Sequence, residues 1–245
     1  MDFLALKNIS EEQIELVNPT SPEKVLAMGR VVGLAKGDQV IDFGCGFGEM
    51  LALWGEAFGI GGVGIDIRPY ACERARSKMA ARGLSDRIEI VCEHAASYDF
   101  TPETYEVATC IGASFVWDGF RGAVRHLGQT LRPGGRLVVG EPYWRRALEP
   151  PRYAQEQAAV HTETELLQMA RAEGYEVAYV LHSSRDEWDR YVSENWRGLL
   201  RWLQEHPEHP ERQDVVDHLH ESQEEYLRYG REYFGWALYA LWPAT

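Results

Sequence analysis

Two acidic residues and three glycines early in the chain have the types and spacing of a site for a nucleotide-like ligand. Asp42 precedes the Gly-Cys-Gly-Phe-Gly segment at 44–48, and Asp66 follows about 20 residues after it. Glycine adopts positive φ without strain and lets a ligand approach the backbone without meeting a Cβ atom. The N–H groups at the start of the next helix favour polar or anionic ligand groups. An acid at the tip of the following strand is where ribose hydroxyls are usually held.

The spacing of the glycines distinguishes between two nucleotide-like ligands. The dinucleotide fingerprint is G-x-G-x-x-G, whereas here the third glycine comes one residue early and Glu49 stands at the last glycine position. Asp42 would repel a pyrophosphate but attract the ammonium group of an amino acid. S-adenosylmethionine carries an ammonium, a sulfonium, a ribose and an adenine but no phosphate. Asp42 and Asp66 therefore favour it over a nicotinamide dinucleotide.

The elements that position these residues are predicted to alternate between strands and helices. Gln39 to Phe43 is a short apolar run, typical of a buried strand, and a second apolar run ends at Asp66. Helical patterns begin near Gly48 and at Pro69. This alternation predicts an α/β fold, with a parallel sheet covered by helices on both faces. Further strands are expected over 88–91, 105–111, 136–140, 175–182 and 232–241.

Ligands of such sheets bind beyond the carboxyl ends of the strands, where the strand order reverses. The residues expected on this rim are Asp42, Gly44, Asp66, His94, Cys110 and Glu141. Cys45 and Cys110 could act as nucleophiles, but cysteine also fits tight and buried positions. We favour a packing role for both thiols.

Two segments fall outside the alternation. Residues 1–20 are predicted to form an N-terminal cap with a helix over 8–17, after which Ser21 caps a helix that begins at Pro22. Apolar residues recur at helical spacing within 185–230, which predicts two helices inserted before the last strand. We expect this insertion to lie over the rim as part of a lid. The alternative is a helical pair packed on the edge of the sheet.

These motifs resemble the class I S-adenosylmethionine-dependent methyltransferases, whose first motif is an acid-x-G-x-G-x-G signature. The resemblance covers roughly 21–240. It implies one domain over 1–245 with a Rossmann-like, doubly wound, seven-stranded and mostly parallel sheet whose last strand is antiparallel. The chain is similar in particular to bacterial methyltransferase-like proteins of the YjhP type. The shared features are Cys-Ile-Gly-Ala-Ser at 110–114, Gly-Glu-Pro-Tyr-Trp at 140–144, Trp-Asp-Arg-Tyr at 188–191, Trp196, and Phe-Gly-Trp at 234–236.

The resemblance implies a cofactor site made of eleven residues. These are Asp42, Gly44, Cys45, Gly46, Gly48, Asp66, Ile67, Arg68, His94, Ala95 and Cys110. Those at 42–48 would surround the methionine part, Asp66 would bind the ribose hydroxyls, and residues 67 and 68 would lie beside the adenine. Many family members have an acid at the position of His94, where it receives the adenine amino group. A neutral imidazole nitrogen of His94 would accept the same hydrogen bond here, or the backbone N–H of Ala95 would do most of the adenine recognition. The competing interpretation is that His94 is only a residue of the rim.

Residues after the fourth and fifth strands are candidates for contact with a methyl acceptor. Methyl transfer requires alignment and exclusion of water, and it needs a base only if the acceptor must lose a proton. Glu141 is a hypothetical general base or substrate-orienting acid, and a salt bridge or helix cap is the competing interpretation. Aromatic faces attract sulfonium and other cations. We predict that the acceptor pocket is lined by Phe115, Trp117, Tyr143 and Trp144.

The composition narrows the possible partners. A net charge of -13 in 245 residues argues against a broad nucleic-acid-binding face. The [D/N]-P-P-[Y/F/W] motif of nucleic-acid amino-methylating enzymes does not follow the fourth strand either, so we predict a small-molecule acceptor. No apolar run reaches the roughly 18 residues that span a bilayer, and residues 1–10 lack a signal-peptide pattern. The four scattered cysteines fit reduced thiols in the cytoplasm. The histidines at 206, 209, 218 and 220 are interpreted as solvated, so no metal is expected.

The sequence therefore predicts a methyltransferase that uses S-adenosylmethionine to methylate a small molecule by in-line transfer. One alternative is a non-catalytic protein that senses or stores S-adenosylmethionine and binds a partner through the helical insertion. The other is a nicotinamide-dependent oxidoreductase, against which the glycine spacing argues.

Overall fold

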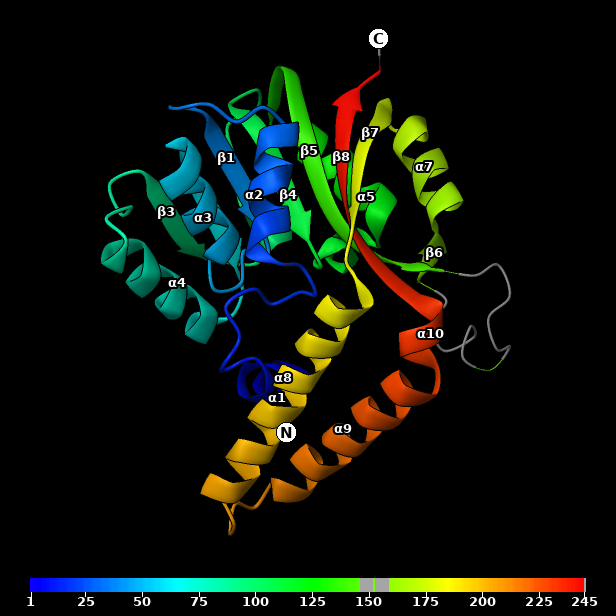
Figure 1. Ribbon diagram of the computed structural model, residues 1–245. Helices are drawn as coiled ribbons and strands as arrows, with labels where there is room; N and C mark the ends of the chain where they lie inside the picture. The colour runs from blue at the N-terminus through cyan, green and yellow to red at the C-terminus, as the bar shows by residue number, and fades with distance from the viewer. Residues whose placement is uncertain (146–151, 153–158, 245) are drawn as a thin grey trace.

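A mixed β-sheet runs through the middle of the protein in a computed structural model, which describes residues 1–145, 152 and 159–244 (Figure 1). The strand order is β3-β2-β1-β4-β5-β8-β7, and the short strand β6 pairs with the end of β5. β8 is antiparallel to both of its neighbours, and the other pairs are parallel. The strands are β1 (Gln39–Phe43), β2 (Gly61–Asp66), β3 (Ile88–Cys92), β4 (Tyr105–Ile111), β5 (Leu131–Trp144), β6 (His161–Thr162), β7 (Tyr175–His182) and β8 (Phe234–Pro243).

This topology confirms the predicted α/β sheet and its antiparallel last strand. β6 adds a strand that the sequence did not predict. β5 is much longer than the expected 136–140, because β8 keeps pairing with it as far as Trp144 opposite Phe234. β8 begins two residues later than expected, since the short helix α10 (Arg231–Tyr233) precedes it.

Helices cover both faces of the sheet, and two hydrophobic clusters lie beneath them. Successive side chains of a strand point to opposite faces, so Val40 belongs to one cluster and Ile41 to the other. The first cluster is covered by α2 (Pro22–Val31), α3 (Glu49–Phe58) and α4 (Pro69–Ala81). The second is covered by α5 (Phe120–Gly128), α7 (Glu163–Ala172) and the short turns η1 (Ala95–Ser97) and η2 (Ser114–Trp117).

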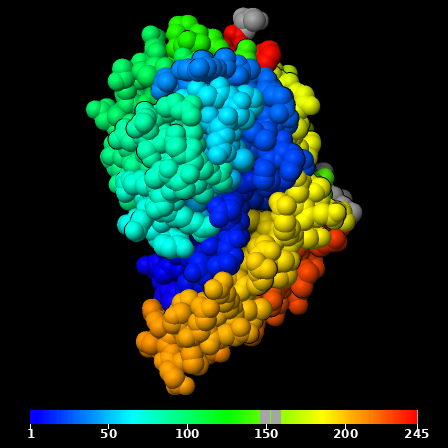
Figure 2. All heavy atoms as spheres, turned by 60° about the vertical axis from the view of Figure 1, so that its left-hand side comes forward, coloured from blue at the N-terminus to red at the C-terminus, as the bar shows by residue number. Residues whose placement is uncertain are grey.

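A pair of helices, α8 (Arg185–Glu205) and α9 (Arg212–Glu225), extends away from the sheet and returns to α10 through the π-helical turn η3 (Tyr226–Gly230) (Figure 1). The pair has a small core of its own, which includes Leu199 and Leu219. α1 (Phe3–Ser10) packs against this core through Leu6 and Ile9. In Figure 2 the dark-blue N-terminal segment lies between the sheet domain and the orange helices.

The N-terminal helix therefore occupies 3–10, and the predicted helix over 8–17 is wrong. The helix begins earlier than predicted because Asp2 caps it: the Asp2 side chain accepts a hydrogen bond from the Ala5 N–H at 2.8 Å. The α2 boundary is confirmed, since the Ser21 hydroxyl accepts from the Lys24 N–H and Pro22 is the first helical residue. Lys24 also forms an ion pair with Glu187, which joins α2 to the start of α8.

Candidate cofactor and acceptor site

The loop between β1 and α3 has the backbone that its glycines predict. Gly44, Gly46 and Gly48 have φ values of 78°, 55° and 69°. A Cβ atom on Gly44 would lie 2.5 Å from the Cβ of Ala113, which no folded protein tolerates without a shift. Only glycine therefore fits this position.

The N–H groups of this loop are used within the protein. Those of Gly44 and Cys45 both donate to the Ile65 carbonyl, at 2.8 and 2.9 Å, and that of Gly46 donates to Asp66 Oδ2 at 2.9 Å. These three N–H groups are therefore not free to receive an anionic ligand, so a pyrophosphate would find no free donor here. The expectation of free N–H groups concerns the start of α3, where the N-cap residue Gly48 makes no side-chain cap.

Asp66 is buried at the tip of β2, where its carboxylate joins three polar groups. Oδ2 accepts from Gly46, and Oδ1 accepts from the Arg68 N–H at 2.9 Å and from Arg68 Nε at 3.4 Å. A carboxylate has about four acceptor positions. Acceptor capacity therefore remains on Oδ2 for a hydroxyl group in the adjoining cavity.

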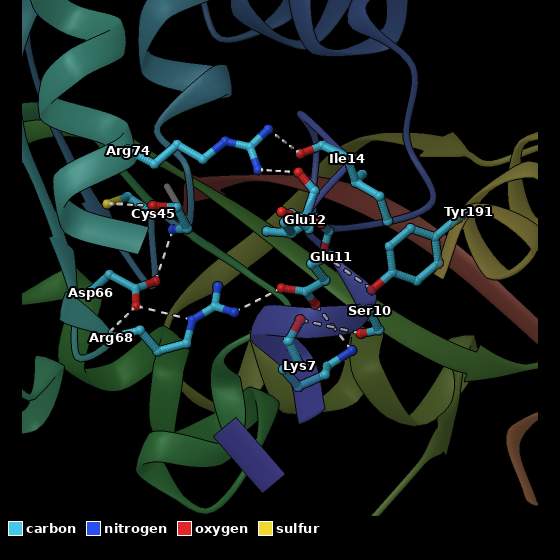
Figure 3. Close-up of polar contacts among 12 residues, drawn as sticks. Lys7, Ser10, Glu11, Glu12, Ile14, Cys45, Asp66, Arg68, Arg74 and Tyr191 are labelled. Carbon is cyan, nitrogen blue, oxygen red and sulfur yellow. Dashed lines mark hydrogen bonds and ion pairs between the residues drawn. The ribbon is translucent and has the colours of Figure 1, made fainter. Parts of the chain in front are cut away.

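A chain of ion pairs connects Asp66 to the N-terminal cap (Figure 3). Arg68 Nη1 contacts Glu11 Oε2 at 2.7 Å, and Glu11 Oε1 contacts Lys7 Nζ at 3.0 Å. Arg74 of α4 holds the same segment by donating to the carbonyls of Glu12 and Ile14, at 2.6 and 3.0 Å. The cap is thus fastened to the strand tip that the sequence assigned to the cofactor.

One cavity of about 580 Å³ lies between the carboxyl ends of the strands, α1 and α8. It brings together seven of the residues that the sequence assigned to cofactor or acceptor: Gly44, Asp66, Ile67, Arg68, His94, Ala95 and Phe115. Sequence reasoning missed other wall residues, among them Phe3 and Leu4 of α1, Trp188 and Tyr191 of α8, and Trp236 of β8. The sequence predicts the helical insertion as part of a lid, and two aromatic residues of α8 face the cavity.

Five predicted cofactor residues do not line this cavity: Asp42, Cys45, Gly46, Gly48 and Cys110. Asp42 is buried and accepts a hydrogen bond from the Thr109 hydroxyl at 2.6 Å, and burial raises its pKa to about 7. Cys45 and Cys110 are also buried, which raises their thiol pKa values well above the ordinary range. Both thiols are therefore packing groups in this structure rather than nucleophiles.

Three of the four predicted acceptor aromatics pack inside or against the core and do not line the cavity. Trp117 stacks on His126 with ring centroids 4.7 Å apart. Trp144 packs on Phe234 at 4.7 Å, and Tyr143 is buried against His182. The reason is the direction of the side chains. Phe115 and Trp117 are two residues apart in a helical turn and therefore point in different directions. Adjacent residues of a strand point to opposite faces of the sheet. Phe115 is the predicted aromatic residue that borders the cavity.

Glu141 is buried next to the cavity, although it does not line it. Its Oε1 accepts from the Ser114 hydroxyl at 2.8 Å, and its Oε2 has no hydrogen-bond partner among the described residues. Burial raises the pKa of this carboxyl to about 7, against the lowering effect of Ser114. The neighbouring residue Pro142 does line the cavity.

His94 caps η1 by accepting the Ala96 N–H on Nδ1 at 3.2 Å. In a neutral imidazole the proton then resides on Nε2, which donates rather than accepts. A ring nitrogen of adenine therefore suits this histidine better than the expected contact with the adenine amino group. The backbone of Ala95 also borders the cavity, and its predicted contact stays a prediction.

Metal binding has no support in the part of the chain that the structure describes, where no group of three or more potential ligands is found. His206 stacks on Trp202 with centroids 4.7 Å apart, and His209 lies 4.9 Å from the same indole. Among the described residues, every helix is too short or too polar to cross a membrane.

Comparisons with known proteins agree with this geometry. Residues 40–135 match a family model described as a methyltransferase domain. The chain is 34% identical over 247 residues to the uncharacterized protein YjhP of Escherichia coli (strain K12), covering 98% of this chain and 99% of that protein. Two similar solved structures are S-adenosylmethionine-dependent methyltransferases from Thiobacillus denitrificans and Geobacter sulfurreducens, each in complex with S-adenosyl-L-homocysteine. Their identities are 34% and 32%, their TM-scores are 0.91 and 0.92, and the alignments cover 99% of this chain and at least 99% of theirs.

The site fits the cofactor of these relatives. The side-chain-free position at Gly44 and the remaining acceptor capacity of Asp66 both face the same cavity. The protein therefore belongs to the class I S-adenosylmethionine-dependent methyltransferases, and its cofactor is S-adenosylmethionine.

Proposed function

We propose that this protein transfers the methyl group of S-adenosylmethionine to a small-molecule acceptor. The observation that supports the acceptor class is the shared cavity, in which Gly44 of the cofactor motif and an apolar wall face the same space of about 580 Å³. Cavities of roughly 300–1,000 Å³ are typical of small-molecule sites. The net charge of -13 disfavours a nucleic-acid substrate.

S-adenosylmethionine supplies an electrophilic methyl group on a sulfonium centre. The protein's contribution in this proposal is to hold the cofactor, orient the acceptor and exclude water. Asp66 and Arg68 hold the nucleoside end, and the loop at 44–48 receives the aminoacyl end at Gly44. Asp42 and the buried cysteines support that loop from behind.

We propose that residues 1–20 and 185–230 act as a cap and lid over this cavity within one methyltransferase domain. Both supply cavity walls, through Phe3 and Leu4 and through Trp188 and Tyr191. The Tyr191 hydroxyl donates to the Val17 carbonyl at 3.4 Å, so the two segments contact each other. Closure of both over bound ligands would exclude water from the reacting atoms.

Glu141 is proposed as the group that accepts a proton from the acceptor or orients it. Support comes from its pKa of about 7 and its unpartnered Oε2, which suit proton transfer near neutral pH. All four cysteines are free, which supports a reducing compartment, and we propose the cytoplasm.

The test is turnover of methyl-labelled S-adenosylmethionine with a pool of small metabolites, compared with the same reaction on RNA and DNA. The proposal expects label in the small-molecule fraction, and less of it with Asp66→Ala. Asp99→Ala, at an acid outside the cavity wall, serves as the matched control. Tight cofactor binding without any labelled product would instead favour a protein that senses or stores the cofactor.

A further inference from the structure

The acceptor half of the cavity lies between η2, β5, β8 and α8, away from Asp66. Its walls include Ala113, Phe115, Pro142, Trp188, Tyr191 and Trp236. We infer that the methyl acceptor is an uncharged molecule with a flat, apolar part that seats against these rings. This inference rests on the proposed function and adds the chemical class of its substrate.

The charged groups of the cavity wall are already paired with one another. Among the described lining residues, Lys7 and Arg68 are both ion-paired with Glu11, and Arg68 also contacts Asp66. These four side chains form the continuous network of Figure 3. A charged acceptor that moved from water into this cavity would therefore find no unpaired counter-charge in the wall. Burying an unpaired charge is strongly unfavourable.

The polar atoms of Trp236 and Tyr191 in the aromatic walls are also engaged. Trp236 Nε1 donates to the Thr20 hydroxyl at 3.1 Å, and the Tyr191 hydroxyl donates to Val17. Both bonds go to the N-terminal segment, so these side chains offer mainly ring carbon to a ligand. Trp188 and Trp236 lie at 72° to each other with centroids 6.4 Å apart, which gives two differently oriented apolar surfaces.

The mouth of the cavity is apolar as well. In the described part of the chain nine large hydrophobic residues are exposed, and four of them line this one cavity. They are Phe3, Leu4, Ile67 and Phe115, with exposed fractions of 62%, 43%, 48% and 73%. Such a concentration around one opening marks a binding site for an apolar ligand rather than ordinary surface.

Aromatic walls can also attract an ammonium ion, so the competing substrate is a cationic amine. The two classes differ in what the wall must supply. An amine entering this half would need a charged carboxylate, and both wall carboxylates are bound to arginine or lysine. Glu141 lies behind the wall, where burial raises its pKa to about 7 and weakens it as a counter-charge. The paired carboxylates favour the uncharged acceptor.

The experiment uses the full-length protein saturated with S-adenosylhomocysteine and the uncharged fluorescent probe N-phenyl-1-naphthylamine. We expect fluorescence to rise on binding, and tert-butylbenzene to displace the probe at a concentration at least about ten-fold lower than its cationic isostere phenyltrimethylammonium does. Phe115→Ser should weaken probe affinity by about five-fold. Leu227→Ser, at an exposed position away from the cavity, should leave it unchanged.

Equal or better displacement by the cation would overturn the inference. An affinity for the probe that is unchanged in Phe115→Ser would also overturn it. Calorimetry with S-adenosylhomocysteine separates this failure from failure of the proposed function. Retained cofactor binding with no probe binding refutes only the acceptor class. Probe binding without cofactor binding would uphold the apolar pocket while refuting the cofactor assignment of the site.

Discussion

Replacing Gly44 by alanine tests whether the loop must lack a side chain. The substitution adds two separate costs. An alanine at φ of 78° loses about 1–2 kcal/mol relative to a right-handed conformation. The new Cβ also meets the Cβ of Ala113 at 2.5 Å, and overpacking of this kind costs about 1–3 kcal/mol. The sum is about 2–5 kcal/mol, which a domain with about 5–15 kcal/mol of stability survives.

Gly134→Ala is the matched control. Gly134 has a φ of 80° and no atom within 4 Å of its added Cβ, so it carries only the backbone cost. Urea unfolding should therefore show Gly44→Ala to be about 1–3 kcal/mol less stable than Gly134→Ala. The double variant Gly44→Ala with Ala113→Gly should recover that difference, because it removes the contact.

Calorimetry with S-adenosylhomocysteine gives the functional result. We expect Gly44→Ala to lower affinity at least about ten-fold, or 1.4 kcal/mol, and Gly134→Ala to leave it unchanged. Equal destabilisation by the two substitutions, together with unchanged affinity in both, would refute the reasoning. That result would show that the loop can move without consequence for the cofactor.

Three further predictions concern buried charge. Asp42 and Glu141 have pKa values of about 7 when folded, so these two carboxyls bind more protons in the folded protein than in the unfolded chain between about pH 4 and 7. Their contribution to the free energy of unfolding should fall as the pH rises through this window, so the free energy of unfolding of Asp42→Asn, measured in urea, should gain relative to that of the wild type as the pH rises from about 4 to 7; a difference that does not change with pH would contradict the raised pKa. Wild-type turnover should rise as Glu141 ionises near pH 7, and Glu141→Gln should cost about 100-fold in kcat without loss of cofactor affinity; unchanged turnover would remove Glu141 from the reaction. Glu11→Gln should release the cap, because it leaves Lys7 and Arg68 without their carboxylate. Hydrogen exchange over α1 should accelerate several-fold, whereas the exposed change Glu12→Gln should have no such effect; equal exchange in both variants would show that the ion pairs do not hold the cap.

Local patterns placed Gly44 and Asp66 correctly in the cavity wall, whereas Asp42, Gly46 and Gly48 do not line it. Gly44 and Asp66 are each close in sequence to the strand that carries them, so composition and spacing were enough to place both on the rim. Phe115 follows the same logic, since it comes directly after β4. Arg68 was placed beside the cofactor by resemblance, but its bond to Glu11 depends on contacts between distant segments.

The walls of the acceptor half are formed by contacts between segments that are distant in the sequence, so local patterns could not predict which residues line it. Trp236 reaches the cavity because β8 pairs antiparallel with β5 and sets it opposite Pro142. A register argument from the predicted antiparallel strand could have found it. Trp188 and Tyr191 are three residues apart and share a helix face. This spacing predicts that both contact the same part of the protein, but it does not predict which part. Trp117 was predicted to line the cavity because it is close in sequence to the rim. Closeness in sequence does not determine the direction of a side chain in a tight turn, and Trp117 points away from the cavity wall.

The most direct measurement is a crystal structure of this protein with S-adenosylhomocysteine. The account predicts that the ribose hydroxyls lie within hydrogen-bonding distance of Asp66 Oδ2 and that the thioether sulfur faces the half bounded by Phe115, Trp188 and Trp236. A nucleoside bound elsewhere, or a sulfur facing away from those rings, would contradict it.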